Sequence, residues 1–331
     1  MDEERITDPQ IKPDEQVFDN NLRPQCLNDF VGQTKIKESL NILLEAARKR
    51  GEPVEHILFY GNPGLGKTTL AHIISKEMQA NIRVIAGPAL GRVGDLAAIL
   101  SNLEEGDILF IDEIHRVNKM IEEILYPAME EYVLDIIVGK GPAARTLRLN
   151  LPKFTLIGAT TKLSMLSAPL RDRFGSHYHL NFYEEDEMRE VIKRSAQILG
   201  VQIDTESISA IANRARKTPR VANRILRRVR DFSEVRSDGK ITPDIAKESF
   251  NLLGIDEKGL DGVDRAILET LIKKFAGGPV GLNTLSAATS EEMETIETIY
   301  EPFLLQLGFL NRTPRGRIAT HLAYEHLKLN N

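Results

Sequence analysis

Short apolar runs alternate with longer amphipathic segments between about residue 24 and residue 182. The runs "HILFY" (56–60), "DILFIDE" (107–113) and "FTLIGATT" (154–161) are typical of strands that are buried on both faces of a parallel sheet. The segment "TTLAHIISKEM" (68–78) has the spacing of an amphipathic helix. Strands that alternate with helices predict βαβ units, so we expect a doubly wound α/β domain over residues 21–183.

After "NFYEEDEM" the apolar positions recur only at helical spacing. Gly200 and Gly254 follow two of these periodic segments and predict helix ends. Thr-Pro pairs at 218–219 and 242–243 predict helix starts. We therefore expect a small all-helical domain over residues 184–255. The first twenty residues are polar and lack periodicity, which predicts a loose arm over residues 1–20.

The last seventy residues combine helical and strand-like patterns. Two helical faces are apolar, one with Ile267, Leu268, Leu271, Ile272 and Phe275, the other with Ile296, Tyr300, Phe303, Leu304 and Leu307. A turn at Pro314–Gly316 then separates two short strand-like segments. Helices followed by a strand–turn–strand predict a winged-helix domain over residues 256–331.

Composition narrows the possible functions only a little. The formal net charge is −5, so the protein is not expected to coat nucleic acid by bulk charge, although local basic patches remain possible. A single cysteine, Cys26, excludes a disulfide framework and a cysteine-rich zinc site. The sequence has no apolar stretch long enough to cross a membrane, and its N-terminus is acidic where a signal peptide would be basic. We expect a soluble, cytoplasmic protein.

The segment "GNPGLGKTTL" (61–70) fits the phosphate-loop pattern G-x-x-x-x-G-K-[ST]. It follows an apolar run and opens a helix, which is the context that the motif requires. Its glycines let backbone N–H groups face a polyphosphate, and the helix N-terminus adds positive potential. Lys67 is then expected to reach the β and γ phosphates, and Thr68 to bind Mg²⁺. A chance glycine-rich turn is the alternative.

A second candidate, "DILFIDEIH", places two carboxylates at the end of a strand. Asp112 is expected to hold Mg²⁺, and Glu113 to polarise the attacking water. Taken alone, such a pair is usually a solvated strand end. Combined with the phosphate loop, it predicts ATP hydrolysis rather than passive nucleotide binding.

Several segments together resemble the RuvB family of AAA+ ATPases, the motors of Holliday junction branch migration in bacteria. The resemblance runs from about residue 20 to the end, and it rests on "LRPQCLNDFVGQ", "GNPGLGKTTLA", "DILFIDEIHR", "GKGPAARTLRLNLPKFTLIGATT", "PLRDRFG", "TPRVANRILRRVRD" and "YEPFLLQLGFLNRTPRGRIAT". It implies an AAA+ domain, a helical lid and a winged-helix head that assemble as a hexamer.

The resemblance also assigns catalytic roles. It makes Thr161 the sensor 1 residue, Arg173 an arginine finger that acts on the neighbouring subunit, and Arg220 the sensor 2 residue. On the residues alone, Thr161 could simply end a strand, and Arg173 could be a surface arginine paired with Asp172. The implied nucleotide contacts are Leu22, Arg23, Gly64, Leu65, Gly66, Lys67, Thr68, Thr69, Glu130, Glu131, Tyr132, Arg173, Tyr183 and Arg220. A core role for Tyr183 is nearly as compatible with the sequence.

Residues 130–152 alternate like a hairpin around the turn "GKGPAA". Ile136, Ile137 and Val138 would form an adhesive edge unless something covers them. The resemblance implies that the cover is a RuvA-type junction-binding protein, and that a RuvC-type resolvase works with the complex. Packing within the chain is the alternative.

The segment "RTPRGR" (312–317) concentrates positive charge in the predicted wing. The resemblance implies that Arg312 and Arg317 contact DNA phosphates, without base readout. The role of Arg315 at the tip is open, and a solvated tail is the alternative. Met293 stands where the family leads us to expect a basic residue.

The leading hypothesis is an ATP-driven translocase on double-stranded DNA at Holliday junctions, with ATP and Mg²⁺ as cofactors. A nucleotide-switched DNA-binding scaffold, of the clamp-loader or initiator kind, is the alternative. The hairpin favours the first, because its sequence is particular to the branch-migration family. A protein unfoldase is disfavoured, since the sequence lacks an aromatic–apolar–Gly pore loop.

Overall fold

The computed structural model describes residues 21–138 and 145–329, without the side chains of 136–146. The predicted arm, residues 1–20, lies outside this range. The chain forms two compact units. The sheet unit contains Arg23–Gly61 and Leu65–Asn181; the helical unit contains Leu22, Asn62–Gly64 and the chain from Phe182 onward.

A parallel sheet forms the centre of the sheet unit. Its strands are β1 (Ile57–Tyr60), β2 (Ile82–Ala86), β3 (Ile108–Asp112), β6 (Thr155–Thr160) and β7 (Ser176–His179), in the spatial order β2-β3-β6-β1-β7. The central strand β6 pairs with β1 and β3, and every residue of β6 is buried. The doubly wound parallel sheet expected from the apolar runs is confirmed.

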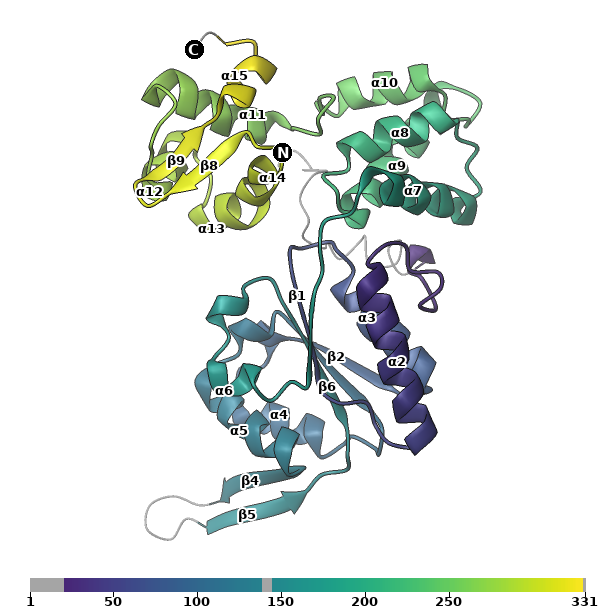
Figure 1. Ribbon diagram of the computed structural model, residues 1–331, viewed down its shortest axis with the longest axis vertical. Helices are drawn as coiled ribbons and strands as arrows, with labels where there is room; N and C mark the ends of the chain where they lie inside the picture. Colours follow the sequence, from purple (N-terminus) through teal and green to yellow (C-terminus); the bar gives the residue numbers. More distant parts are fainter. Residues whose placement is uncertain (1–20, 139–144, 330–331) are drawn as a thin grey trace. The chain divides into compact units, whose positions relative to one another are not determined.

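Helices cover both faces of this sheet (Figure 1). On one face lie α2 (Thr34–Arg50) and α3 (Lys67–Met78), and on the other lie α4 (Val93–Leu100), α5 (Lys119–Glu130) and α6 (Ala168–Arg171). The last three helices pack on a core that includes Leu109, Ile111 and Leu156. Because parallel strands end at one edge, the loops after β1, β3 and β6 are brought together there.

A hairpin of β4 (Val133–Val138) and β5 (Arg145–Asn150) projects from the sheet unit (Figure 1). The antiparallel pairing predicted from the sequence is confirmed, with Asp135 opposite Arg148. Leu134 is fully buried and belongs to the core, which anchors the root of the hairpin. The predicted turn, residues 139–144, lies outside the described residues, as do the side chains of Ile136, Ile137 and Val138.

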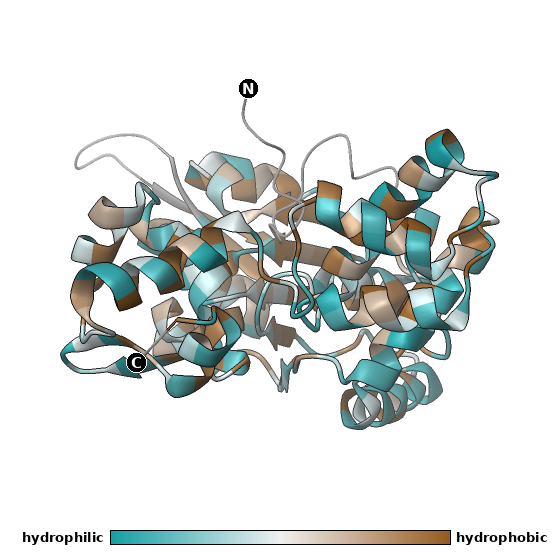
Figure 2. Ribbon diagram, turned by 90° about the horizontal axis from the view of Figure 1, so that it is seen from above, coloured by the Kyte–Doolittle hydropathy of each residue, from teal (hydrophilic) through white to brown (hydrophobic). Residues whose placement is uncertain are grey.

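The first part of the helical unit consists of α7 (Glu185–Leu199), α8 (Thr205–Arg214), α9 (Pro219–Arg236) and α10 (Pro243–Leu252). Apolar and hydrophilic residues alternate along their ribbons, as expected for amphipathic helices (Figure 2). Gly200 ends α7 in the left-handed conformation, at φ 66°, and the Thr242 hydroxyl caps α10. The predicted helix boundaries are confirmed at both sites.

The second part of the helical unit is a winged helix. Its helices are α11 (Gly262–Glu269), α12 (Leu282–Thr289), α13 (Met293–Thr295), α14 (Glu301–Gln306) and α15 (His321–His326), and its wing is β8 (Leu310–Thr313) with β9 (Gly316–Ala319). The two predicted apolar faces meet in one core around Leu268, Leu271, Tyr300 and Leu304. Both predicted helices contain a π-helical turn, at Thr270–Lys274 and Ile296–Tyr300, which an apolar pattern does not distinguish from an α-helix. No helix in the described ranges is long and apolar enough to cross a membrane.

Candidate active site and nucleic-acid interface

The phosphate loop links β1 to α3 and depends on glycine for its backbone path. Gly61, Gly64 and Gly66 have φ of 140°, 80° and 102°, a region that favours glycine. At Gly61, a Cβ atom would lie only 2.5 Å from the carbonyl oxygen of Leu180. The Lys67 side chain is buried, and its Nζ donates to the Gly61 carbonyl at 2.7 Å. The N-terminus of α3 and an ammonium group therefore converge on one loop, as polyphosphate binding requires.

Asp112 lies at the end of β3, beside the start of α3. The Thr68 hydroxyl donates to its Oδ2 at 3.3 Å. A hydroxyl and a carboxylate this close match the oxygen ligands that Mg²⁺ prefers, alongside water and phosphate oxygens. The structure thus brings the two predicted metal ligands together, although they are far apart in sequence.

Glu113 follows Asp112 in a left-handed conformation, at φ 48°. Its Oε2 accepts hydrogen bonds from the Thr161 hydroxyl at 3.0 Å and the Thr161 N–H at 3.3 Å. Burial raises the pKa of the Glu113 carboxyl, but the hydrogen bond with His115 and the charge of Lys67 outweigh it and leave the pKa below its ordinary value. The carboxylate is therefore ionised at neutral pH, as a general base must be.

Two residues near Glu113 have a role that the sequence reasoning missed. The buried His115 ring places Nδ1 3.1 Å from Glu113 Oε2 and 2.8 Å from the Thr160 hydroxyl. At Gly87, a Cβ atom would lie 2.4 Å from the Glu113 carbonyl oxygen, so only glycine fits there. His115 follows the two carboxylates in "DILFIDEIH", and this position in the sequence could have indicated its role. No feature of the sequence around Gly87 indicates a role for that residue.

Arg173 lies beyond α6 and is held by residues of its own unit. Its Nη2 donates to Glu130 Oε2 at 3.1 Å, and its Nη1 donates to the Pro169 carbonyl at 2.6 Å. The guanidinium also stacks over the Tyr126 ring, 4.3 Å from the ring centre. The alternative partner, Asp172, instead lies 3.9 Å from Arg171.

The helical unit holds a second group of predicted nucleotide contacts. A Cβ atom at Gly64 would lie 3.3 Å from the Cβ of Arg220, so the loop residue and the start of α9 are in close contact. Tyr183 is buried, and its N–H donates to the Lys217 carbonyl at 3.1 Å. Leu22 is also buried, and its carbonyl accepts from Arg194 at 2.7 Å. Leu22, Gly64, Tyr183 and Arg220 therefore belong to one unit.

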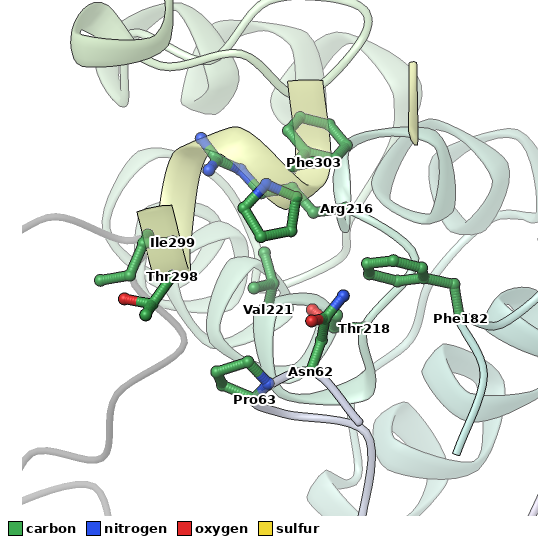
Figure 3. Close-up of a pocket in the computed structure, with 10 residues that line it drawn as sticks. Asn62, Pro63, Phe182, Arg216, Thr218, Val221, Thr298, Ile299 and Phe303 are labelled. Carbon is green, nitrogen blue, oxygen red and sulfur yellow. The ribbon is translucent and has the colours of Figure 1, made fainter. Parts of the chain in front are cut away.

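A pocket of the same unit opens beside Asn62 and Pro63 (Figure 3). Thr218, two residues before Arg220, lines it together with Arg216 and Phe303. The Arg216 guanidinium lies 4.9 Å from the centre of the Phe303 ring. The pocket thus lies where the segment before α9 meets the winged helix.

The wing arginines differ in exposure. Arg317 is buried, and its Nη2 donates to the buried Glu301 carboxylate at 2.9 Å. Arg312 pairs with Glu297 at 3.2 Å but keeps 55% of its side chain exposed. Arg315 is exposed at the turn between β8 and β9. Arg312 and Arg315 are thus accessible to a phosphate, whereas Arg317 is occupied by Glu301.

Comparison with known proteins matches nearly the whole chain to one family. Residues 22–180 match the Holliday junction DNA helicase RuvB P-loop domain, residues 183–256 the RuvB AAA lid domain, and residues 257–328 the RuvB C-terminal winged helix domain. The chain belongs to the RuvB family. Its three-part fold, an AAA+ ATPase domain followed by a lid and a winged helix, is therefore confirmed.

Individual relatives in the RuvB family match over the full chain. The Holliday junction branch migration complex subunit RuvB of Dehalococcoides mccartyi is 59% identical over 329 residues, covering 99% of this chain and 94% of the relative. The corresponding subunit of Chloroflexus aurantiacus is 57% identical with the same coverage. The solved Thermotoga maritima RuvB branch migration motor is 49% identical, with a TM-score of 0.86, and covers 94% of this chain and 99% of that one.

Membership of the RuvB family assigns a function to the site described above. The chain is an ATP-driven branch migration motor of the RuvB family, and nucleotide binding follows from its P-loop domain. The leading hypothesis of a branch-migration motor is thereby confirmed over the scaffold alternative, while Mg²⁺ stays a prediction. The individual site residues remain predictions, which the structure groups into a catalytic set on the sheet unit and a lid set on the helical unit.

Proposed function

We propose that this chain hydrolyses ATP as one subunit of a homohexameric ring that pulls double-stranded DNA through a Holliday junction. The observation that carries the proposal is the position of Glu113. Its ionised carboxylate is fixed by Thr161 next to the Thr68–Asp112 pair, at the edge of the sheet where the phosphate loop begins. A carboxylate in this place is suited to repeated turnover rather than to passive nucleotide binding.

The catalytic roles follow from the same contacts. Lys67 and the N-terminus of α3 bind the β and γ phosphates, while Thr68 and Asp112 would hold Mg²⁺. The ion would neutralise charge on the phosphate oxygens. Glu113 accepts a proton from the attacking water, and Thr161 orients the Glu113 carboxylate. Arg173 of one subunit stabilises charge on the γ-phosphoryl group bound by its neighbour.

The remaining nucleotide contacts have two proposed roles. Leu22, Arg23 and Tyr183 form the adenine and ribose wall, and Arg220 is the sensor 2 residue that acts on the phosphates. The other proposed contacts come from the phosphate loop and from the end of α5: Leu65, Gly66, Thr69, Glu130, Glu131 and Tyr132. Their identity rests on the family resemblance.

The wing grips DNA through its backbone. Exposed Arg312 and Arg315 support this proposal, because arginines on a hairpin can meet phosphates of any sequence. Arg317 has a structural role in this proposal: its ion pair with Glu301 holds the wing against α14. Met293 is 45% exposed at the start of α13 and offers no phosphate contact.

Partners are proposed from family membership. A RuvA-type junction-binding protein would cover the β4–β5 hairpin at Ile136, Ile137 and Val138, and a RuvC-type resolvase would cleave the junction afterwards. The hairpin supports this, since its root is anchored in the core while its strands project (Figure 1). The cytoplasm is the proposed location.

Dissociation of a synthetic four-way junction tests the function. With ATP, Mg²⁺ and a RuvA-type partner, the wild-type protein is expected to separate the junction into its arms. The Lys67→Ala variant is expected to fail because it does not bind ATP. Hydrolysis of ATP by the wild type without any junction dissociation would contradict the motor and favour a nucleotide-switched scaffold.

A further inference from the structure

Three groups of the sheet unit hold the Arg173 guanidinium in place. Glu130 accepts from Nη2 at 3.1 Å, the Pro169 carbonyl accepts from Nη1 at 2.6 Å, and the Tyr126 ring lies under the guanidinium plane at 4.3 Å. Tyr126 and Glu130 are one helical turn apart on α5, so both present their side chains on one face. Only 21% of the Arg173 side chain is exposed.

The Tyr126 ring is itself fixed by a polar cluster beneath it. Its hydroxyl donates to Glu122 Oε2 at 3.2 Å and lies 3.2 Å from the Ser167 hydroxyl. Ser167 also donates to Glu122 at 2.6 Å and caps the N-terminus of α6. Because the Glu122 carboxylate is buried, a rearrangement that breaks its hydrogen bonds would cost free energy. The ring orientation is therefore set by α5 and α6 together.

The three contacts of Arg173 differ in how easily they can be exchanged. The Glu130 carboxylate is 55% exposed, and exposed ion pairs stabilise little, so a phosphate could replace it. Stacking on an aromatic face restricts an arginine without using its outer N–H donors. Tyr126 can thus keep the guanidinium oriented while Glu130 is displaced.

We propose that Tyr126 is a positioning residue for the arginine finger, and that Glu130 occupies Arg173 until the neighbouring subunit's γ-phosphate takes its place. The proposal rests on the assignment of Arg173 as a finger acting between subunits. Tyr126 preorganises Arg173 for the neighbour's site and contributes nothing to ATP binding in its own.

The first test compares two substitutions of Tyr126. Tyr126→Leu is expected to lower the single-turnover rate of ATP hydrolysis about tenfold with little change in ATP affinity, because a flexible finger is misplaced. Tyr126→Phe keeps the stacking face and is expected to retain most of the rate. A wild-type rate in Tyr126→Leu, or equal losses in both variants, would overturn the proposal.

A second test uses mixed rings to separate positioning from misfolding. Glu113→Gln subunits cannot hydrolyse ATP but carry an intact finger. Mixed with an excess of them, Tyr126→Leu subunits should regain the wild-type single-turnover rate, because each meets a normal finger from its neighbour. A misfolded subunit would not recover, and lack of recovery would overturn the proposal.

Arg173→Ala mixed with Glu113→Gln in the same way keeps the two proposals distinguishable. If Arg173→Ala subunits regain the single-turnover rate and Tyr126→Leu subunits do not, the positioning role of Tyr126 is refuted. The assignment of Arg173 as the finger then still holds. If Arg173→Ala also fails to recover, the assignment of Arg173 as a finger between subunits is wrong. The single-turnover rate is measured because it does not require neighbouring subunits of the ring to hydrolyse ATP one after another.

Discussion

The Arg216 guanidinium donates to the Asp264 carboxylate, which is completely buried, and so joins the segment before α9 to the first turn of α11. Asp261 lies 3.1 Å from the same guanidinium, and the Gly259 carbonyl accepts from its Nε at 3.2 Å. Burial raises the pKa of Asp264 to about 7, against the charge of Arg216. Arg216 lies four residues before Arg220, so one short segment connects the winged helix to the proposed sensor.

Arg216→Met is expected to destabilise the helical unit strongly. It leaves Asp264 buried without its partner, and breaking a buried pair in this way costs about 3–5 kcal/mol. Denaturant unfolding measures the loss. Lys273→Met is the matched control, since it removes an exposed pair with Glu269 and should change the unfolding free energy by less than about 1 kcal/mol. Equal effects of the two substitutions would contradict a special role for Arg216.

His72 in α3 should make the protein less stable in acid. Burial, followed by the nearby charges of Arg23 and Lys76, lowers its pKa from 6.5 to about 4. The unfolded chain therefore binds a proton at a higher pH than the folded one, and the free energy of unfolding falls as pH drops from about 6.5 to 4. His72→Gln should remove this part of the slope in unfolding measured from pH 4 to 8. Parallel curves for the two proteins would refute the assignment.

Glu113→Gln should separate ATP binding from hydrolysis. The amide keeps the shape of the side chain but cannot accept a proton, so hydrolysis is expected to fall by about 10²–10⁴-fold. ATP affinity, measured by titration, should change little, whereas Lys67→Ala should lose binding itself. Hydrolysis at the wild-type rate in Glu113→Gln would remove Glu113 from its proposed role.

The wing arginines should respond differently to substitution by alanine. Arg312→Ala and Arg315→Ala are each expected to weaken duplex binding and to reduce the salt slope of the affinity by about one. Arg317→Ala should instead lower the thermal unfolding temperature, because the buried Glu301 loses its closest charged partner and keeps only Arg312, at 3.7 Å. If Arg317→Ala unfolds like the wild type yet binds DNA weakly, Arg317 contacts DNA directly.

The sequence predicted most of the elements because their signals are local. Unbroken apolar runs predicted β1, β3 and β6, and the glycines with Lys67 and Thr68 predicted the loop between β1 and α3. Asp112 and Glu113 could be assigned because both motifs stand at strand ends, which meet at one edge of a parallel sheet. The β4–β5 hairpin followed from its alternation.

Contacts between distant side chains could not be predicted in the same way. The carboxylate of Glu113 meets Thr161 48 positions away, and Arg173 meets Glu130 43 positions away. No periodicity in the sequence encodes such pairings. They depend on how α5, α6 and the strand ends pack, and hence on the whole core of the sheet unit.

The arginine-rich wing separates what the sequence predicts from what only the tertiary structure decides. The sequence by itself determined that positive charge gathers on a hairpin around Pro314 and Gly316, since turn residues and strand patterns are read locally. Only the tertiary structure decided which arginines remain available. Arg312 and Arg317 are paired across the hairpin, yet Arg317 is buried against Glu301 while Arg312 stays exposed. The packing of α14 against β8 and β9 makes this distinction, because a buried carboxylate requires a charged partner.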